Sequence, residues 1–338
     1  MESDILKKLV TLCLVIILIW YCVPKFRDIL DRDIEYRDTN VLNKIENSES
    51  MSKEVKENYS IDNLKRIKLG DTKEHLISQI GKPNRIDESE YSFKWYVYNQ
   101  YKNKFAMVGV ENNIVVALYS NSINSDEMKN LKIGDNRDEI RKINQPLEYK
   151  KKGNTRYIIT SDDQYDIFHI EHKYITVFYD IYNENKVCSY QVISDDAENS
   201  LDSMYPQESD ILKESYELQV IDLTNSVREK RGLNKLTYSE KATKSARKHS
   251  LDMINENYFD HMNKKQQTPF DRMKNEGIVY RGAGENIAAG QVSAIYAHEA
   301  WMNSEGHRKN ILGNYKYIGV GVEFGGHYTI YYTQNFYI

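Results

Sequence analysis

Residues 317–336, which read YIGVGVEFGGHYTIYYTQNF, decide the fold of the C-terminal part of the chain. Apolar and polar residues alternate on both sides of Gly325-Gly326, a pattern typical of two strands that each bury one face. A Gly-Gly pair between such strands is a strong hairpin signal, because glycine readily adopts the positive φ angles of tight hairpin turns. This stretch therefore predicts a β-hairpin at the end of the chain.

Helical patterns precede the hairpin. Apolar residues from Ile211 onward recur on one helix face, and the pattern stops near Gly232. A second helix is expected after Ser239, because a serine side chain can accept a hydrogen bond from the first turn. Both helices have the length and the apolar stripe of helices that pack against a core.

Two shorter helices follow. One is expected from Thr268-Pro269 to Gly277, since a capping threonine, a proline at the first position and a glycine after the end are typical helix boundaries. Another runs over about residues 293–302. Together with the terminal hairpin, the helices indicate a mixed, layered α+β domain over residues 211–338.

Residues 298–308, HEAWMNSEGHR, begin like the HExxH helix of zinc proteases. In that motif two histidines four positions apart bind zinc from one helix face. Here Met302 occupies the position of the second histidine, and the next one, His307, lies nine residues after His298. The sequence therefore does not contain the HExxH motif.

Three residues of ligand type stand near the ends of the expected elements. His261 follows the second helix in NYFDH, Glu285 follows the third in GAGEN, and His307 follows the fourth in NSEGH. If these side chains converge, they can bind one divalent cation and leave a coordination position for water. The alternative is that they are three exposed loop residues.

Several stretches of the C-terminal part follow one another in a characteristic order: NSVREKRGLNKL, ARKHSLDMINENYFDH, TPFDRM, GENIAAGQ, AHEAWMNSEGHRKNIL, YIGVGV and YTQNF. Through them, residues 211–338 resemble a bacterial CAP domain, of the superfamily of cysteine-rich secretory proteins, antigen 5 and pathogenesis-related proteins. Residues 61–194 resemble the CAP-associated N-terminal domain that precedes this module in surface proteins of Gram-positive bacteria. The resemblance implies an alpha-beta-alpha sandwich with an open cleft.

The resemblance also implies a site, because two histidines and two acidic residues face each other in the cleft of many members. His261 and His307 are then the metal-binding imidazoles, with Zn²⁺ as the first candidate ion, and Glu285 is the first carboxylate. Glu299 is our choice for the second carboxylate. Many relatives have it three residues after the helix tryptophan, where this chain has Ser304, and Glu305 is a further candidate.

Three other histidines are expected to have different roles. His327 in GGHYT imitates the GHYTQ signature of eukaryotic relatives, but it sits beside the hairpin turn. His298 is expected at the surface or next to a metal ligand, and His249 lies on an apolar helix face, which favours a core position.

The region before the CAP-like part contains an internal repeat, KLGDTKEHLISQIGKP at 68–83 and KIGDNRDEIRKINQP at 132–146. Asp71 and Asp135 suit the N-caps of two short helices. Each copy then runs into segments rich in Tyr, Phe and Val, which predicts a helix-plus-antiparallel-sheet unit used twice over residues 61–194. The expected hairpin turns lie at residues 111–113 and 183–185.

The N-terminus carries an uncharged apolar run at residues 9–23, with lysines before and after it. A cleaved signal peptide needs small residues at its cleavage site, whereas this run ends in WYCVP. We therefore expect an uncleaved signal anchor over residues 1–27, which would form a single transmembrane helix with the bulk of the chain outside the cell. Residues 28–60 are expected to be a charged tether, and residues 195–210 a polar linker.

Composition further limits the classes of protein to which this chain can belong. A chain of 338 residues has room for two domains, and its net charge of -4 gives no signature of nucleic-acid binding. Cys13 and Cys22 lie in the apolar run, so Cys188 is left without an intramolecular partner. The exported part is therefore expected to be stabilised by its cores and not by disulfides.

Three functions fit these expectations. The first is a membrane-anchored, extracytoplasmic binding module whose cleft holds a divalent metal and a lipid, cell-wall or protein ligand. The second is a metal-dependent hydrolase, a peptidase or esterase, with Glu285 as general base. The third is a structural role, in which the repeated domain docks the CAP module onto another surface protein. We favour binding over catalysis, because no nucleophile with a dedicated base is evident.

Overall fold

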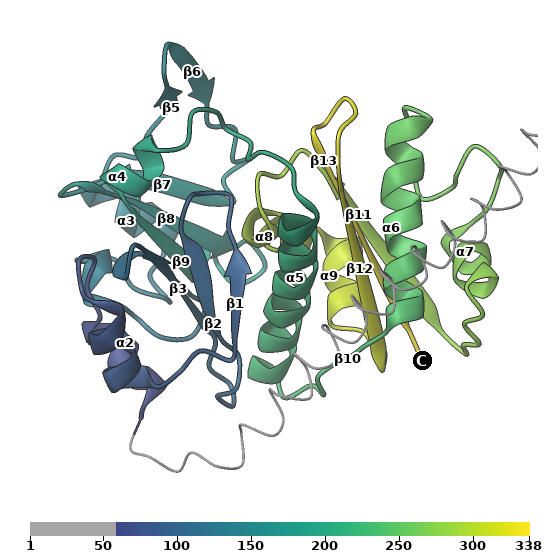
Figure 1. Ribbon diagram of the computed structural model, residues 1–338, viewed down its shortest axis with the longest axis horizontal. Helices are drawn as coiled ribbons and strands as arrows, with labels where there is room; N and C mark the ends of the chain where they lie inside the picture. Colours follow the sequence, from purple (N-terminus) through teal and green to yellow (C-terminus); the bar gives the residue numbers. More distant parts are fainter. Residues whose placement is uncertain (1–58) are drawn as a thin grey trace, which may run out of the picture. The chain divides into compact units, whose positions relative to one another are not determined.

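The computed structural model describes residues 59–338 (Figure 1). The expected anchor, residues 1–27, and all but the last two residues of the expected tether lie outside the described residues. Within residues 59–338, no helix is both long enough and apolar enough to cross a membrane.

The first half of the described chain is built around a seven-stranded antiparallel sheet of order β1-β2-β3-β4-β9-β8-β7. A separate hairpin, β5-β6, stands beside it (Figure 1). The strands are β1 (Arg85–Glu88), β2 (Lys94–Tyr98), β3 (Ala106–Glu111), β4 (Ile114–Ser120), β5 (Tyr149–Lys152), β6 (Thr155–Ile158), β7 (Tyr165–His169), β8 (Lys173–Asp180) and β9 (Lys186–Ser194). The helices are η1 (Ile61–Arg66), α2 (Lys73–Ile80), η2 (Asp126–Met128), α3 (Arg137–Ile143) and α4 (Asp195–Asn199).

The sequence repeat is also a structural repeat. The backbone N–H of Gly70 donates to Val115 of β4 at 2.8 Å, and that of Gly134 donates to Val187 of β9 at 2.9 Å. Both glycines have positive φ angles, +93° and +98°, which glycine adopts without steric cost. Each repeat is therefore hydrogen-bonded to one of the two neighbouring strands β4 and β9. The expected turns at 111–113 and 183–185 are confirmed as hairpin turns.

The prediction that Asp71 and Asp135 cap the two short helices is wrong by one residue. The N-caps are Thr72 and Asn136, whose side chains accept hydrogen bonds from backbone N–H groups of the first turn. Each aspartate carboxylate instead accepts from the backbone N–H three residues upstream, at 2.8 Å in both copies. The aspartates thus close the turn before the helix, which is a common alternative use of this side chain.

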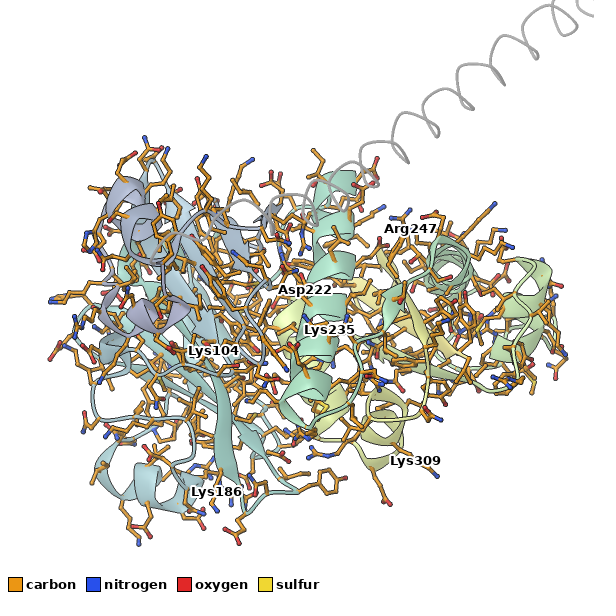
Figure 2. All side chains as sticks on the ribbon, turned by 90° about the horizontal axis from the view of Figure 1, so that it is seen from below. Lys104, Lys186, Asp222, Lys235, Arg247 and Lys309 are labelled. Atoms are coloured by element: carbon orange, nitrogen blue, oxygen red, sulfur yellow. The ribbon has the colours of Figure 1, made fainter. Side chains whose placement is uncertain are left out.

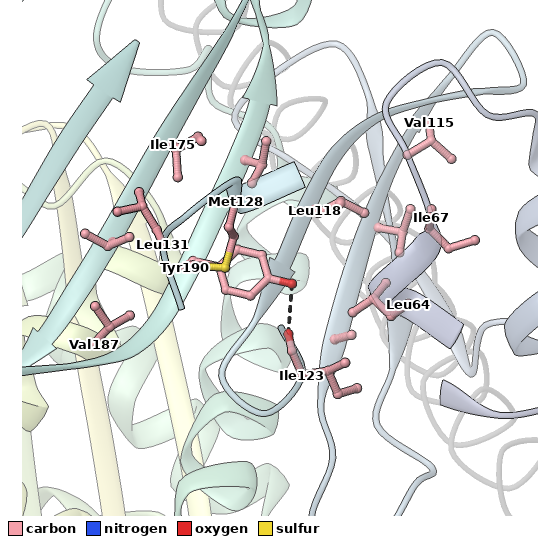
Figure 3. Close-up of a cluster of buried hydrophobic side chains, with 14 of the residues drawn as sticks. Leu64, Ile67, Val115, Leu118, Ile123, Met128, Leu131, Ile175, Val187 and Tyr190 are labelled. Carbon is pink, nitrogen blue, oxygen red and sulfur yellow. Dashed lines mark hydrogen bonds between the residues drawn. The ribbon is translucent and has the colours of Figure 1, made fainter. Parts of the chain in front are cut away.

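The core of this half lies between the sheet and the short helices (Figure 3). Its centre contains Tyr190 of β9, which is fully buried and donates its hydroxyl hydrogen to the carbonyl oxygen of Ile123 at 2.9 Å. A buried phenol needs such a partner, because an unpaired hydroxyl in an apolar environment is costly.

The expected linker is partly structured. Its first five residues form α4, capped by Ser194. Glu198 of this helix is 2% exposed and forms ion pairs with Lys150 and Lys152 of β5. One acidic residue of the expected linker therefore belongs to a buried ion-pair cluster.

The second half contains a four-stranded sheet of order β10-β12-β13-β11. The predicted terminal hairpin is confirmed, with its turn at Gly325 and Gly326, whose φ angles are +130° and +64°. The strands are β10 (Thr237–Tyr238), β11 (Ala283–Ala289), β12 (Tyr317–Phe324) and β13 (Ile330–Tyr337), and the helices are α5 (Asp210–Lys230), α6 (Glu240–Asn255), α7 (Pro269–Asn275), α8 (Ala294–Met302) and α9 (Glu305–Ile311).

These elements form three layers (Figure 1). Helix α6 covers one face of the sheet, while α5, α8 and α9 lie on the other. Two glycines of β12 allow α6 to approach closely, because a Cβ atom at Gly319 or Gly321 would lie 2.2 or 2.0 Å from backbone atoms of α6. The four predicted helices are present, whereas α9 and β11 were not predicted.

We expect Gly321→Ala to lower the free energy of unfolding by about 3 kcal/mol, since the added methyl group must push α6 away from the sheet. Urea denaturation of the wild type and the variant measures this difference. Gly306→Ala is the matched control, because nothing lies within 4 Å of a Cβ at that position. A loss below about 0.5 kcal/mol for Gly321→Ala would show that the helix and sheet separate easily.

Candidate functional site

The centre of the candidate site is Glu285, which lies in β11 and not in a loop as expected. Its side chain is 1% exposed. One carboxylate oxygen, Oε1, accepts a hydrogen bond from Nδ1 of His261 at 2.9 Å, and the other, Oε2, accepts one from Nη2 of Arg272 at 2.7 Å. A buried carboxylate is thus compensated by a guanidinium and bonded to an imidazole.

Arg272 comes from α7 and connects the elements of the site. Besides Glu285, its guanidinium donates through Nη1 to the carbonyl oxygens of His261 and Gln267, at 2.8 and 3.0 Å. Arg272 therefore holds the backbone of the loop that carries His261 as well as the carboxylate that orients its ring.

His249 of α6 adds a third side chain behind the carboxylate. It is fully buried, its Nε2 donates to the carbonyl oxygen of Asp260 at 3.1 Å, and the same nitrogen lies 3.9 Å from Oε1 of Glu285. Burial lowers the pKa of His249 to about 4, so its imidazole is neutral near pH 7. This agrees with the core position expected from the sequence.

His307 lies inside α9, whereas the sequence placed it after a helix. Its carbonyl oxygen accepts a hydrogen bond from Nδ2 of Asn286 in β11, and Nδ2 of Asn310 donates to the carbonyl oxygen of Glu285. Burial, together with the nearby charge of His261, lowers the pKa of His307. The structure therefore brings His261, Glu285 and His307 into one region.

The donor atoms of this region suit a metal ion only in part. Nδ1 of His261 is bonded to a carboxylate, and this is the usual arrangement of a histidine that ligates a metal through Nε2. His307 is biased toward its neutral form, which ligation requires. However, no group of three or more His, Cys, Asp or Glu side chains within residues 59–338 has the geometry to hold a metal ion. Two imidazoles are the donor set that these residues offer.

Glu299, our choice for the second carboxylate, is engaged elsewhere. Its Oε1 accepts hydrogen bonds from Ser189 at 2.5 Å and Tyr119 at 3.3 Å, and its Oε2 accepts one from Sγ of Cys188 at 3.4 Å. All three partners belong to β4 and β9 of the first half. Burial raises the pKa of Glu299, and its side chain links the two halves of the described chain.

The other candidates for the fourth polar group lie at the start of α9. Ser304 is the N-cap residue and Glu305 is the first helical residue, with an exposed side chain. The side chain of Ser304 makes no capping hydrogen bond. The buried side chain that completes the environment of Glu285 is Arg272, which the sequence reasoning missed although it stands in the TPFDRM stretch.

Of two other histidines, His298 lies elsewhere than predicted and His327 lies where it was predicted. His298 is not at the surface, because it is fully buried in α8, and neither of its ring nitrogens has a hydrogen-bond partner in the part of the chain that the structure describes. Its helix packs against α5, α9 and β11. His327 is exposed beside the hairpin turn, where the sequence placed it.

The corner between α8 and α9 is held by the first half of the chain. The guanidinium of Arg308, next to His307, forms two hydrogen bonds of 2.9 Å with the carboxylate of Asp180 at the end of β8. A second link joins Arg85 of β1 to Asp222 of α5 at 2.7 Å. Figure 2 labels Asp222 among the side chains of the described residues. The helix that carries His307 is therefore fixed by both halves of the described chain.

Comparisons with known proteins agree with this architecture. The family model described as CAP-associated N-terminal matches residues 69–204, and that of the cysteine-rich secretory protein family matches residues 221–336. A Bacillus subtilis protein named "Uncharacterized membrane protein YlbC" is 32% identical over 289 residues, which cover 79% of this chain and 82% of that protein. The "Uncharacterized protein YkwD" of the same organism is 53% identical over 117 residues, which cover 34% of this chain and less than half, 46%, of that protein.

Two solved structures are similar as well. An extracellular protein with an SCP domain from Bacillus anthracis superposes with a TM-score of 0.68 at 26% identity, covering 84% of this chain and 98% of its own. A cysteine-rich secretory protein from Staphylococcus aureus superposes with a TM-score of 0.64 at 18% identity, covering 80% and 91%, which supports the fold alone. The chain therefore belongs to the cysteine-rich secretory protein (CAP) family, with a CAP-associated N-terminal domain ahead of the CAP domain.

Proposed function

We propose that this protein is an extracytoplasmic binding protein, anchored in the cell membrane by residues 1–27, whose CAP domain holds a divalent metal between His261 and His307. Zn²⁺ is the first candidate, because imidazole nitrogens are among its usual ligands. The ligand held at the metal would be a lipid, a cell-wall component or another surface protein. The names of two relatives, one a membrane protein and one an extracellular protein, support this location.

The observation that carries the proposal is the chain of contacts from Arg272 through Glu285 to Nδ1 of His261. A carboxylate that accepts from Nδ1 fixes the imidazole tautomer and leaves the lone pair of Nε2 available to a metal. His261 is also 47% exposed at its side chain, so an ion can reach it. With two protein ligands, the remaining coordination positions are left for water or for the bound ligand.

This geometry favours binding over hydrolysis. A general base needs a carboxylate oxygen that faces the attacking water, whereas both oxygens of Glu285 are already bonded, to His261 and to Arg272. The carboxylate is also almost completely buried. We therefore assign Glu285 the role of orienting His261 and do not assign it the role of general base.

Replacing both His261 and His307 by alanine is expected to abolish Zn²⁺ binding to the full chain, and each single replacement is expected to weaken it by roughly 10-fold or more. Isothermal titration calorimetry with Zn²⁺ measures these affinities. His327→Ala is the matched control, because this histidine is exposed beside the hairpin turn. Unchanged Zn²⁺ affinity in the double variant would rule out the proposed site.

Glu285→Gln separates the two roles considered for this carboxylate. Glutamine keeps the shape of the side chain but removes its charge, so we expect Zn²⁺ affinity to fall by roughly 10-fold to 100-fold. Peptide or ester turnover that is present in the wild type and lost in this variant would instead support the hydrolase.

A further inference from the structure

A cavity of about 290 Å³ lies between the two halves of the described chain, and its lining includes neither His261 nor His307. On one side it is bounded by the β5-β6 hairpin, β7 and α4, and on the other by the loop at residues 290–292 and by α8. Ligand sites commonly form between domains. The volume of the cavity is near the lower limit for ligand pockets, so the cavity suits a small molecule.

One wall of the cavity is aromatic. The ring of Tyr296 from α8 lies 5.2 Å from that of Tyr165 and 5.1 Å from that of Phe178, centroid to centroid, and both pairs are edge-to-face. Tyr165 and Phe178 belong to the first half of the chain, while Tyr296 belongs to the CAP domain. The two halves thus share an apolar surface that can hold a hydrocarbon group.

A second wall carries positive charge. Lys150 and Lys152 are 8% and 5% exposed, and both form ion pairs with the carboxylate of Glu198, at 2.9 and 2.8 Å. Among these buried groups, two ammonium charges face one carboxylate, which leaves an excess of one positive charge. An ammonium group has three N–H donors, so the lysines can also donate to an anionic ligand.

A third part of the lining offers acceptors without donors. Oε2 of Glu90 and Oε1 of Gln291 have no hydrogen-bond partner among the described residues, and Glu90 is 5% exposed. The neighbouring Gln191 leaves its Nε2 without a partner too. Burial raises the pKa of Glu90 to about 7, and the charge of Lys150 offsets this rise only in part. Buried polar atoms normally have partners, so these oxygens call for a donor.

We propose that this cavity binds a small, apolar α-amino acid as its zwitterion. Its ammonium group would donate to the free oxygens of Glu90 and Gln291, and its carboxylate would accept from Lys150 and Lys152. The side chain would pack against the aromatic wall. This site goes beyond the proposed metal function and is independent of it.

The pairing of charges distinguishes this ligand from simpler ones. An amine alone would offer no acceptor to the N–H donors of the two lysines, and an acid alone would leave the free oxygens of Glu90 and Gln291 without a donor. A neutral sugar would compensate neither. Only a ligand with both charged ends satisfies the two polar walls at once, and the buried groups, with Glu90 ionised, then remain neutral as a set.

Isothermal titration calorimetry of the full chain, purified in detergent, tests the proposal with L-leucine as the probe. Isoamylamine and 4-methylpentanoate are matched controls, because each has the leucine side chain with one charged end, and glucose represents a neutral polyol. We expect L-leucine to bind, and each of the other three compounds to bind at least 10-fold more weakly or not at all. No binding of L-leucine, or comparable binding of any control compound, would overturn the proposal.

Two variants locate the binding. Glu90→Gln keeps the shape but removes the charge, and Gln291→Met removes the acceptor from a partly exposed loop position. Each is expected to weaken L-leucine binding 10-fold or more, with unchanged thermal unfolding as the check on folding. Glu88→Gln is the control, because its carboxylate pairs with Lys94 outside the cavity.

The double variant that lacks His261 and His307 should bind L-leucine like the wild type, which separates this site from the metal site. Wild-type L-leucine affinity in either the Glu90→Gln or the Gln291→Met variant would contradict the proposed contacts.

Discussion

Replacing Arg272 by methionine is expected to lower the free energy of unfolding by about 3–5 kcal/mol. The Glu285 side chain is 1% exposed and that of Arg272 is 8% exposed, so their ion pair is shielded from water. Without the guanidinium, the buried Glu285 carboxylate loses its arginine ion-pair partner and the hydrogen bond that this partner donates. Two carbonyl oxygens, of His261 and Gln267, lose their donor as well. Methionine retains most of the apolar stem, so the loss reports the charge and the hydrogen bonds.

Urea denaturation of the wild type and the variant measures this difference. Arg281→Met is the matched control, because Arg281 is an exposed arginine in the same region of the chain. Combining Arg272→Met with Glu285→Gln should recover part of the stability, since the uncompensated charge is then removed. A loss below about 1 kcal/mol for Arg272→Met alone, or no recovery in the double variant, would contradict the importance of this buried pair.

The sequence predicts the helices of the CAP domain well because their boundaries are local signals. Ser239 and Thr268 are the N-caps of α6 and α7, and Gly277 follows the end of α7 with a positive φ of +71°. Such signals act through hydrogen bonds within a few residues, so they can be read from the chain alone. The Gly-Gly turn of the terminal hairpin is of the same kind.

Strand β11 was missed for a physical reason. Its sequence, AGENIAA, shows no alternation of apolar and polar residues and contains only one β-branched residue, Ile287, and most of it is buried. It is a strand because it pairs with β13 along its whole length. A tertiary contact of this kind overrides the weak local preference, and it places Glu285 inside the sheet and not in a loop.

The site was predicted in part for a similar reason. Resemblance brought His261, Glu285 and His307 together, but the ion pair with Arg272 depends on how α7 packs against β11. The position of Glu299 depends on the first half of the chain, whose strands β4 and β9 supply its hydrogen-bond donors. Sequence spacing within the CAP domain carries no information about that contact.

The second large effect is a loss of stability in acid caused by His298. Burial, aided by the charge of Arg231, lowers the pKa of this histidine to about 3, from 6.5 in an unperturbed side chain. Below pH 6.5 the unfolded chain takes up a proton that the folded chain excludes. The free energy of unfolding therefore falls as the pH drops from about 6.5 toward about 3, and His298 alone accounts for about 3 kcal/mol between pH 7 and pH 4.

His298→Leu is expected to remove this part of the decline, because leucine fills a similar volume and does not titrate. His249, with its pKa lowered to about 4, remains in the variant and retains its own share of the acid loss. Urea denaturation at pH 7 and pH 4 measures the loss of unfolding free energy in the wild type and in the variant. His327→Leu serves as the control because His327 is exposed. An equal loss between pH 7 and pH 4 in the wild type and in His298→Leu would mean that the buried imidazole can take up a proton at little cost. The free nitrogens of His298 would then have to reach water or another acceptor in the folded protein, which their complete burial argues against.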